Sequence, residues 1–290
     1  MMGSRMWRWG LAGLAGLLLA SLPQVASAAR TSSATAGPTY YLALGDSLAT
    51  GYQPSDAGPL SSCGFQNGYA CDLYAALLHS HPNLQPVNLS CPGETTTSML
   101  TGVGSPCFSS GPPQLARALR FLARHRGHVA LITIDIGANN VDGCVSSSSV
   151  SVTCVSQGMQ AVAMQLPVIL SALRGTAGAA VPIVGMNYYD PFLAAYFLPG
   201  GTTLASESLA VTLAFNRLLG GIYASAGDPV ADVQSAFGTL DGLAASADLI
   251  CLLTWMCSSP NLPNIHPNEA GYSVIATAFE QVPVVATLLT

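Results

Sequence analysis

The sequence contains no lysine, and only 8% of its 290 residues are charged. Nine arginines stand against ten aspartates and four glutamates, which gives a formal net charge of −5 without a basic stripe. A nucleic-acid-binding surface needs clustered positive charge, so no nucleic-acid partner is expected. The apolar fraction of 50% excludes a disordered tail. Together these features favour one globular domain with a large core.

Long hydrophobic runs are scarce as well. Arg5 and Arg8 precede an apolar stretch from Leu11 to Leu22, and Ala26-Ser27-Ala28 follows it, which is the pattern of a secretory signal peptide. The stretch is shorter than the roughly 20 residues that span a bilayer, and later runs are shorter or broken. We therefore expect a secreted monomer without a stable membrane span. Its expected parts are a signal peptide at 1–28, a linker at 29–39 and one domain at 40–290.

Eight cysteines follow the expected cleavage site, namely Cys63, Cys71, Cys91, Cys107, Cys144, Cys154, Cys251 and Cys257. An even number in an oxidising compartment indicates four disulfides. No C-x-x-C pair is present and no histidine lies at zinc-ligand spacing from two cysteines, which disfavours metal binding. Short spacing favours the pairs Cys144–Cys154 and Cys251–Cys257.

Strands and helices are expected to alternate along the chain. Five short apolar runs are typical of buried parallel strands: Tyr40–Leu44, Val87–Leu89, Val129–Ile136, Val181–Met186 and Val230–Val233. Between and after them, helices are expected around Tyr69–Leu77, Leu115–Arg126, Gln157–Leu173, Leu204–Tyr223 and from Asn268 onward. Pro167 should kink or split the third helix. The alternation predicts an α/β three-layer sandwich with a five-stranded parallel sheet, which binds ligands beyond the carboxyl ends of its strands.

Four short motifs fall near these strand ends. Ser47 follows the first strand in Gly-Asp-Ser, where its hydroxyl could be a nucleophile or belong to an ordinary turn. Gly93 follows the second strand and could turn a backbone N–H toward an oxyanion, or only form a turn. Asn139 follows the third strand and offers a neutral amide donor, or an Asx turn. His266 precedes the last helix and is the natural general base near neutral pH.

The order and spacing of the four motifs resembles the SGNH, or GDSL, hydrolase family from about Tyr40 to Gln281. The resemblance implies the SGNH hydrolase fold, which is a flavodoxin-like sandwich, together with activity on esters and no metal or other cofactor. It also implies that Ser47 is the nucleophile and His266 the base. The oxyanion hole would consist of the N–H groups of Ser47 and Gly93 and the amide of Asn139.

The sequence departs from the family at the aspartate that orients the histidine, because Pro263 stands three residues before His266. Some family members resemble this case, and they imply a Ser–His dyad whose imidazole donates to a backbone carbonyl. Three carbonyls could take that role, those of Asn261, Leu262 and Pro263. Asn264 and the more distant Asp248 remain alternatives. A neutral partner supplies no charge for the imidazolium, so a slower enzyme is expected.

The resemblance also suggests a pairing for the other four cysteines. Secreted actinobacterial lipases of the family have a cysteine two residues before the second-motif glycine, bridged to the loop after the nucleophile. Cys91 occupies that position. This similarity implies Cys63–Cys91 and leaves Cys71–Cys107 as the fourth pair.

The substrate is the least determined feature. Five aromatic residues could wall an acyl pocket or be ordinary core and loop side chains: Tyr188, Phe192, Tyr196, Phe197 and Trp255. The expected partner is a small-molecule or lipid ester, and short-chain carboxylesters, phospholipids and acetylated sugars all fit. Two rivals remain. One is a catalytically silent secreted lipid- or sugar-binding module, which Pro263 favours. The other is a structural secreted protein whose motifs are coincidental turns.

Overall fold

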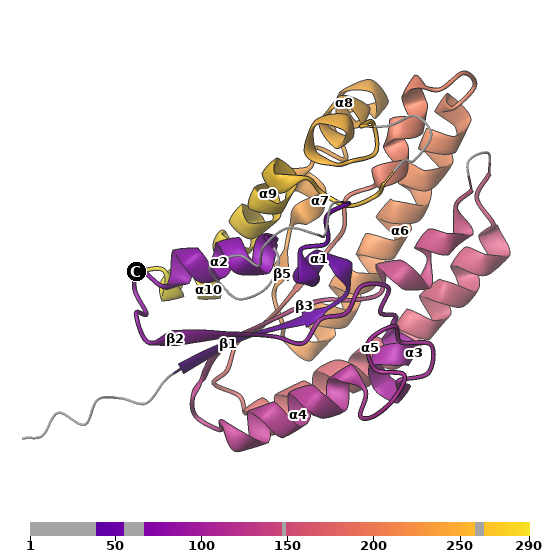
Figure 1. Cartoon of the computed structure of the whole chain (residues 1–290). Helices are drawn as coiled ribbons and strands as arrows, with labels where there is room; N and C mark the ends of the chain where they lie inside the picture. Colours follow the sequence, from indigo (N-terminus) through magenta and orange to yellow (C-terminus); the bar gives the residue numbers. More distant parts are fainter. Residues whose placement is uncertain (1–38, 55–66, 147–148, 259–263) are drawn as a thin grey trace, which may run out of the picture. The chain divides into compact units, whose positions relative to one another are not determined.

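The computed structural model describes residues 39–54, 67–146, 149–258 and 264–290. Its centre is a sheet of five parallel strands in the order β2-β1-β3-β4-β5 (Figure 1). The strands are β1 (Thr39–Gly45), β2 (Leu84–Asn88), β3 (Val129–Asp135), β4 (Ile183–Met186) and β5 (Val230–Ala231). This is the flavodoxin-like order, so the predicted sandwich is confirmed. The expected signal peptide, and all of the expected linker except Thr39, lie outside the described residues.

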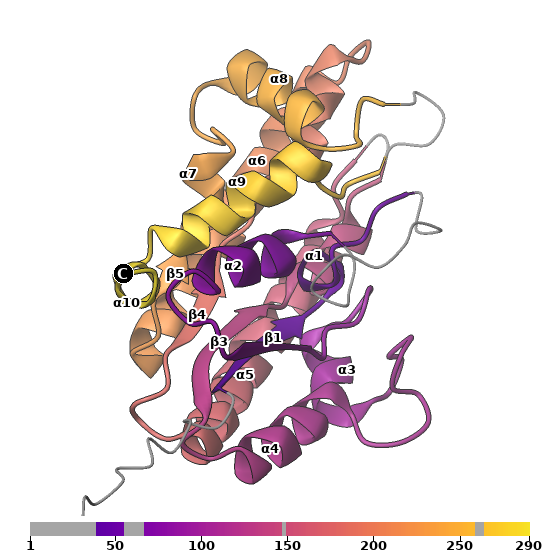
Figure 2. The same cartoon turned by 60° about the vertical axis from the view of Figure 1, so that its left-hand side comes forward.

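Helices cover both faces of the sheet (Figures 1 and 2). One face carries α3 (Thr96–Thr101), α4 (Gln114–Arg124), α5 (Val152–Ala177) and α6 (Thr202–Ala226). The other carries α2 (Tyr69–Leu77) and α9 (Glu269–Glu280), with α8 (Leu243–Leu253) and α10 (Pro283–Leu288) packed on α9. Short helices follow β1, β3, β4 and β5 at the carboxyl edge of the sheet: α1 (Ser47–Thr50), η1 (Ala138–Asn140), η2 (Asp142–Cys144), η3 (Pro191–Phe197) and α7 (Val233–Ala236). That edge is where the predicted motifs gather.

The five predicted helices are all present, and two of them differ from expectation. Pro167 lies inside α5, yet α5 is one helix of 26 residues, so the predicted split does not occur. The buried side chains of Leu166 and Ile169 anchor the helix on both sides of the proline. Helix α6 is long and apolar enough to cross a membrane, with a hydropathy of 1.2, although no span was expected after residue 28. Its packing against α5 and η3 buries part of these apolar residues, among them Phe215, Leu219 and Tyr223.

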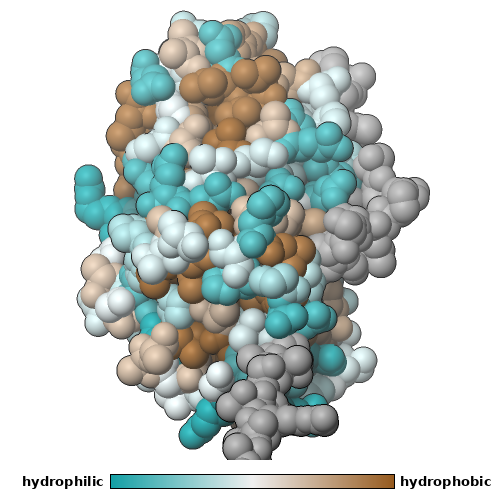
Figure 3. Space-filling view, turned by 90° about the vertical axis from the view of Figure 1, so that its left-hand side faces the viewer, coloured by the Kyte–Doolittle hydropathy of each residue, from teal (hydrophilic) through white to brown (hydrophobic). Residues whose placement is uncertain are grey.

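Large aromatic side chains fill the layers between helices and sheet. Tyr69 of α2 stacks on Phe279 of α9, with ring centroids 4.8 Å apart. On the opposite face, Tyr223 of α6 lies over Gly185 of β4, where any Cβ would collide with the tyrosine ring. On the surface shown in Figure 3, hydrophobic residues form separate patches divided by bands of hydrophilic residues. The main apolar mass is therefore internal.

Disulfides join loops at the edge of the sandwich. Three join described cysteines, namely Cys91–Cys107, Cys144–Cys154 and Cys251–Cys257. The last two are the pairs predicted from short spacing, and they are confirmed. Cys71 is also disulfide-bonded, and its partner lies outside the described residues.

The predicted pairs Cys63–Cys91 and Cys71–Cys107 are wrong, because Cys91 and Cys107 bond to each other. The reason is the path of the chain after β2. Helix α3 ends at Gly102, whose φ of 76° reverses the chain. The chain then returns, and the two Cα atoms lie 6.0 Å apart. The bridge is therefore local to the second motif.

Candidate active site

Ser47 is the first residue of α1, directly beyond β1. The strand ends at Gly45, whose φ of 130° suits only glycine, and a Cβ there would collide with Asp135. Gln114, the first residue of α4, fixes the backbone of Gly45 by two hydrogen bonds. Its Oε1 accepts from the Gly45 N–H at 2.8 Å, and its Nε2 donates to the Gly45 carbonyl at 2.9 Å. Asp46 caps α1. Ser47 is thus fixed at the strand end with a side chain that is mostly buried.

His266 lies between α8 and α9 and contacts Ser47 across 219 positions of sequence. The distance from His266 Nε2 to Ser47 Oγ is 2.8 Å. Three contacts hold the histidine in place. Its carbonyl accepts from the Trp255 backbone N–H at 3.0 Å, and the Tyr189 hydroxyl donates to the carbonyl before it at 2.7 Å. The ring of Tyr52 packs on the imidazole, with centroids 4.4 Å apart.

The side chain of Asn264 faces the other ring nitrogen. Asn264 Oδ1 lies 2.6 Å from His266 Nδ1 and accepts the His266 backbone N–H at 2.9 Å. A backbone N–H can only donate, so the amide atom beside it must be the oxygen, and Nδ1 must carry the ring proton. This tautomer leaves the lone pair of Nε2 toward the Ser47 hydroxyl.

Asn264 is thus the described residue beside Nδ1, and the expectation of a backbone carbonyl stays a prediction. The three carbonyls considered, at residues 261–263, lie outside the described residues. Asp248, the other alternative, is exposed on α8. An amide oxygen orients the ring as a carbonyl would, and like a carbonyl it brings no negative charge.

Gly93 lies in a turn formed by Cys91-Pro92-Gly93-Glu94. The Glu94 N–H donates to the Cys91 carbonyl at 3.1 Å, proline is second, and Gly93 has a φ of 78°, which are the features of a type II turn. Asn139 Nδ2 donates to the Glu94 carbonyl at 3.1 Å and has a second hydrogen to offer. Among the described residues nothing accepts from the N–H groups of Gly93 and Ser47. Each of these three groups therefore has a hydrogen that no described residue accepts.

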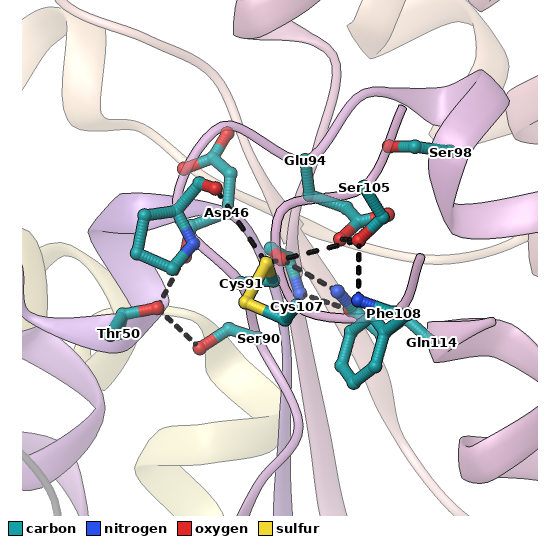
Figure 4. Close-up of a disulfide and its surroundings, with 12 residues drawn as sticks. Asp46, Thr50, Ser90, Cys91, Glu94, Ser98, Ser105, Cys107, Phe108 and Gln114 are labelled. Carbon is teal, nitrogen blue, oxygen red and sulfur yellow. Dashed lines mark hydrogen bonds between the residues drawn. A yellow bond between two sulfur atoms is a disulfide. The ribbon is translucent and has the colours of Figure 1, made fainter. Parts of the chain in front are cut away.

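The Cys91–Cys107 disulfide ties this turn to the loop that follows α3, and a hydrogen bond ties it to the nucleophile strand (Figure 4). The Cys91 N–H donates to the carbonyl of Gly45 at 3.0 Å. Beyond the disulfide, the Ser105 hydroxyl donates to the buried carboxylate of Glu94 at 2.8 Å. The second motif is thus held covalently and by hydrogen bonds at a fixed place beside β1.

Two buried carboxyl groups lie beneath the nucleophile turn. Asp135, at the end of β3, accepts from the Tyr69 hydroxyl at 2.5 Å, the Asp46 N–H at 3.3 Å and the Ala49 N–H at 3.2 Å. Burial raises the pKa of both Asp46 and Asp135, and the charge of Asp46 raises the pKa of Asp135 further. Of the two carboxyl groups, Asp135 is therefore the one whose protonated form is favoured more strongly.

A cavity of about 60 Å³ opens beside Ser47 and His266. Apolar side chains form most of its wall, among them Val141, Val145, Phe192, Val211, Phe215 and Ile265. Asp142, Tyr188 and Tyr189 add polar groups. Of the five aromatic residues considered for a substrate pocket, Tyr188 and Phe192 line this cavity. Trp255 does not, because its indole N–H donates to Gln53 at 2.8 Å, outside the lining.

Some residues of the site escaped sequence reasoning. Tyr52, Asp142 and Tyr189 were not predicted as site residues. The one sequence feature that could have indicated them is that each lies within a few residues of a predicted motif or of Tyr188. Tyr196 and Phe197 were considered as pocket walls and are absent from the cavity; Phe197 is 51% exposed. Within the part of the chain that the structure describes, no three His, Cys, Asp or Glu residues are grouped so that they could hold a metal ion.

A hydroxyl and an imidazole in hydrogen-bond contact at the carboxyl edge of a parallel sheet have the geometry of a serine hydrolase site. Residues 43–274 match the GDSL-like lipase/acylhydrolase family, and the chain belongs to that family. No curated protein matches the sequence.

Several solved structures share the fold. An extracellular lipase from Streptomyces rimosus is 21% identical with a TM-score of 0.53, over 86% of this chain and 99% of that one. A phospholipase A1 from Streptomyces albidoflavus is 18% identical with a TM-score of 0.53, over 87% and 99%. An acetylxylan esterase from Geobacillus stearothermophilus is 16% identical with a TM-score of 0.53, over 84% and 94%.

Proposed function

We propose that the chain is a secreted serine esterase that hydrolyses carboxylic esters with short acyl groups through an acyl-enzyme on Ser47. The observation that carries the proposal is the 2.8 Å contact between Ser47 Oγ and His266 Nε2, made by residues 219 positions apart. Membership of the lipase/acylhydrolase family supports ester hydrolysis as the reaction. The disulfides support an oxidising compartment, as does the signal-peptide pattern at residues 1–28.

The proposed reaction follows from the positions of the Ser47 hydroxyl proton and of the ring proton of His266. His266 Nε2 takes the proton of the Ser47 hydroxyl while Oγ attacks the ester carbonyl. The resulting oxyanion is stabilised by the N–H groups of Ser47 and Gly93 and by the amide of Asn139. The imidazolium then gives its proton to the alkoxide, so that the alcohol leaves and the acyl group stays on Oγ. In the second half, His266 deprotonates water, which releases the acid and restores the hydroxyl.

Asn264 sets the tautomer of His266 but contributes no charge. In the common triad an aspartate stabilises the imidazolium that forms in both transition states. Here the partner is a neutral amide oxygen at 2.6 Å. We therefore describe the machinery as a Ser–His–Asn arrangement that is slower than an aspartate triad would be.

The size of the cavity favours a short acyl chain. About 60 Å³ leaves room for a few heavy atoms beside Ser47. Among the solved structures with this fold are an acetylxylan esterase and a phospholipase A1. Acetylated sugars and lipid esters therefore belong in the test set with simple esters.

Covalent labelling tests the proposal directly. The mature protein is treated with a fluorophosphonate probe and digested, and mass spectrometry locates the adduct. We expect the adduct on Ser47, its loss in Ser47→Ala, and strongly slowed labelling in His266→Ala. An intact, folded protein that takes no adduct at any site would support the silent binding module and overturn the proposal. An adduct at another residue would overturn the assignment of Ser47 as the nucleophile.

A chain-length series with nitrophenyl esters tests the substrate class. Acetate and butanoate esters should be hydrolysed with a higher kcat/KM than octanoate and longer esters, because the cavity cannot accommodate a long chain. A preference that rises with chain length would contradict this assignment without affecting the labelling result.

A further inference from the structure

The cavity beside Ser47 is apolar in most of its wall but contains several polar groups that the mechanism does not use, and two of them lie at the carboxyl edge of the sheet and make no hydrogen bond within the described residues. They are the hydroxyl of Tyr188 and the carboxyl of Asp142. Tyr188 follows β4, and Asp142 begins η2 after the third motif. Two neighbouring loops at the carboxyl edge thus each bring one polar group to the space where an acyl chain would lie.

The Tyr188 hydroxyl is buried without a partner. The residue is 5% exposed, and its hydroxyl makes no hydrogen bond within the described residues. Its position is fixed, because Asn216 accepts from the Tyr188 N–H at 2.9 Å and donates to its carbonyl at 2.7 Å. Buried hydroxyls are usually satisfied, so an unpaired one at a cavity points to a group from a ligand.

Asp142 is half-buried, and its carboxyl makes no hydrogen bond within the described residues. Burial raises its pKa to about 8, and the charges of Asp46 and Asp190 add to the rise. The charges of Asp46 and Asp142 also raise the pKa of the Tyr188 hydroxyl, so these groups lie within electrostatic range of one another. No arginine lines the cavity to neutralise the carboxyl.

We propose that the cavity binds an acyl chain carrying a hydroxyl group, which bonds to the Tyr188 hydroxyl and the Asp142 carboxyl. A hydroxyl is both donor and acceptor, so it can accept from Tyr188 and donate to Asp142 at once. A methyl group in the same place would leave the Tyr188 hydroxyl buried and unpaired, which is unfavourable, and would give the half-buried Asp142 carboxyl no partner. The inference rests on the proposed ester hydrolysis and names the acyl class within it.

Isosteric ester pairs test this inference on the mature protein. The nitrophenyl esters of 3-hydroxybutanoic and 3-methylbutanoic acid differ by a hydroxyl in place of a methyl, as do those of 2-hydroxypropanoic and 2-methylpropanoic acid. Each kcat/KM is divided by the rate constant for hydroxide-catalysed hydrolysis, which removes the intrinsic reactivity. We expect the hydroxy ester of at least one pair to be favoured by about tenfold or more.

Variants assign that preference to the two polar groups. Tyr188→Phe keeps the ring and should reduce the hydroxy-to-methyl ratio several-fold, and Asp142→Leu should do the same. Tyr223→Phe is the matched control, because that buried hydroxyl donates to the Ile134 carbonyl at 3.4 Å, away from the cavity. Its ratio should equal that of the wild type.

The outcomes separate this inference from the proposed function. Ratios of one or below in both pairs, or a preference unchanged in Tyr188→Phe, would overturn the hydroxyacyl inference while ester hydrolysis stands. If no ester is hydrolysed in a Ser47-dependent way, the proposed function fails and the inference falls with it. Because the ratio is measured within each preparation, partial misfolding of a variant does not alter it.

Discussion

The hydrogen bond between Asn264 and His266 is the least usual residue-scale feature of the site. We predict that Asn264→Ala lowers kcat for nitrophenyl acetate on the order of 10²-fold, because the imidazole loses the group that holds its proton on Nδ1. Asn264→Asp should raise kcat above wild type, because a carboxylate at 2.6 Å would stabilise the imidazolium. Steady-state kinetics of the three proteins measures both effects.

Asp248→Ala serves as the control for this series. Asp248 is exposed on α8, so its removal should leave kcat within about twofold of wild type, as for most surface substitutions. Wild-type kcat in Asn264→Ala would show that another group orients the imidazole. A loss of activity in Asp248→Ala comparable with that in His266→Ala would assign the role to Asp248.

Adjacent asparagines allow a matched test of the oxyanion donors. Asn139→Ala should lower kcat by about 10²–10³-fold with a small change in KM, because the amide acts mainly in the transition state. Asn140 instead bonds α3: its Oδ1 accepts the Thr96 N–H at 3.0 Å and its Nδ2 donates to the Thr96 hydroxyl at 3.1 Å. Asn140→Ala should therefore lower Tm while changing kcat only a few-fold. Equal kcat losses in both variants would argue against the oxyanion role of Asn139.

The sequence motifs predicted the contact between Ser47 and His266. Ser47 follows a strand and His266 precedes the last long helix, and the parallel sheet brings both positions to its carboxyl edge. They did not identify the partner of Nδ1. Asn264 was only one of several alternatives. Its side chain is brought to the ring by a local turn, in which Oδ1 accepts the His266 N–H. That turn depends on contacts of the loop with Trp255 and Tyr189, which no local pattern encodes.

At the scale of elements, the alternation of strands and helices was sufficient to predict the sheet. The short helices at its carboxyl edge were missed, since three to seven residues carry too little periodicity to be recognised. Pro167 was misjudged for another reason. One missing hydrogen bond is outweighed by tertiary packing of the buried face of α5, and that packing is a property of the whole sandwich. The Cys91–Cys107 pair likewise depends on the return path after α3.

The Cys91–Cys107 disulfide should affect both stability and activity. Closing a loop of 16 residues contributes about 3 kcal/mol in the chain-entropy treatment. We predict that Cys91→Ser/Cys107→Ser lowers Tm and also lowers kcat, because Gly93 lies two residues from Cys91 in the same turn. Calorimetry and nitrophenyl acetate kinetics measure the two effects.

Removal of a disulfide outside the second motif provides the comparison; its loop contains Trp255, whose backbone N–H contacts the His266 carbonyl. Cys251 and Cys257 are separated by only 6 positions, so their bridge should contribute about 2 kcal/mol in the same treatment. Cys251→Ser/Cys257→Ser is expected to lower Tm less and to leave kcat closer to wild type. If kcat falls equally in the two double variants, the effect is a general one, and the disulfide does not specifically position the second motif.

At the scale of the whole molecule, carboxyl groups are buried with little compensation by positive charge. Within the described residues, Arg174 and Asp228 form the one ion pair. Burial raises the pKa of Asp190 to about 7 and that of Asp142 to about 8. The domain therefore tolerates these aspartates by keeping them protonated.

Stability should consequently fall as the pH rises through neutrality. Below about pH 4 both states hold these protons, whereas between about pH 4 and 8 the unfolded chain releases them and the folded state retains them, so the free energy of unfolding decreases with pH. We predict a lower Tm at pH 8.5 than at pH 5.5, each kcal/mol lost lowering Tm by about 2–4 °C. Scanning calorimetry across this range measures the dependence of Tm on pH. That dependence should be weaker in Asp142→Asn than in the wild type, and unchanged in the exposed Asp248→Asn. A wild-type Tm that rises with pH would contradict the prediction, because it would require these carboxyls to be ionised and stabilised in the folded state.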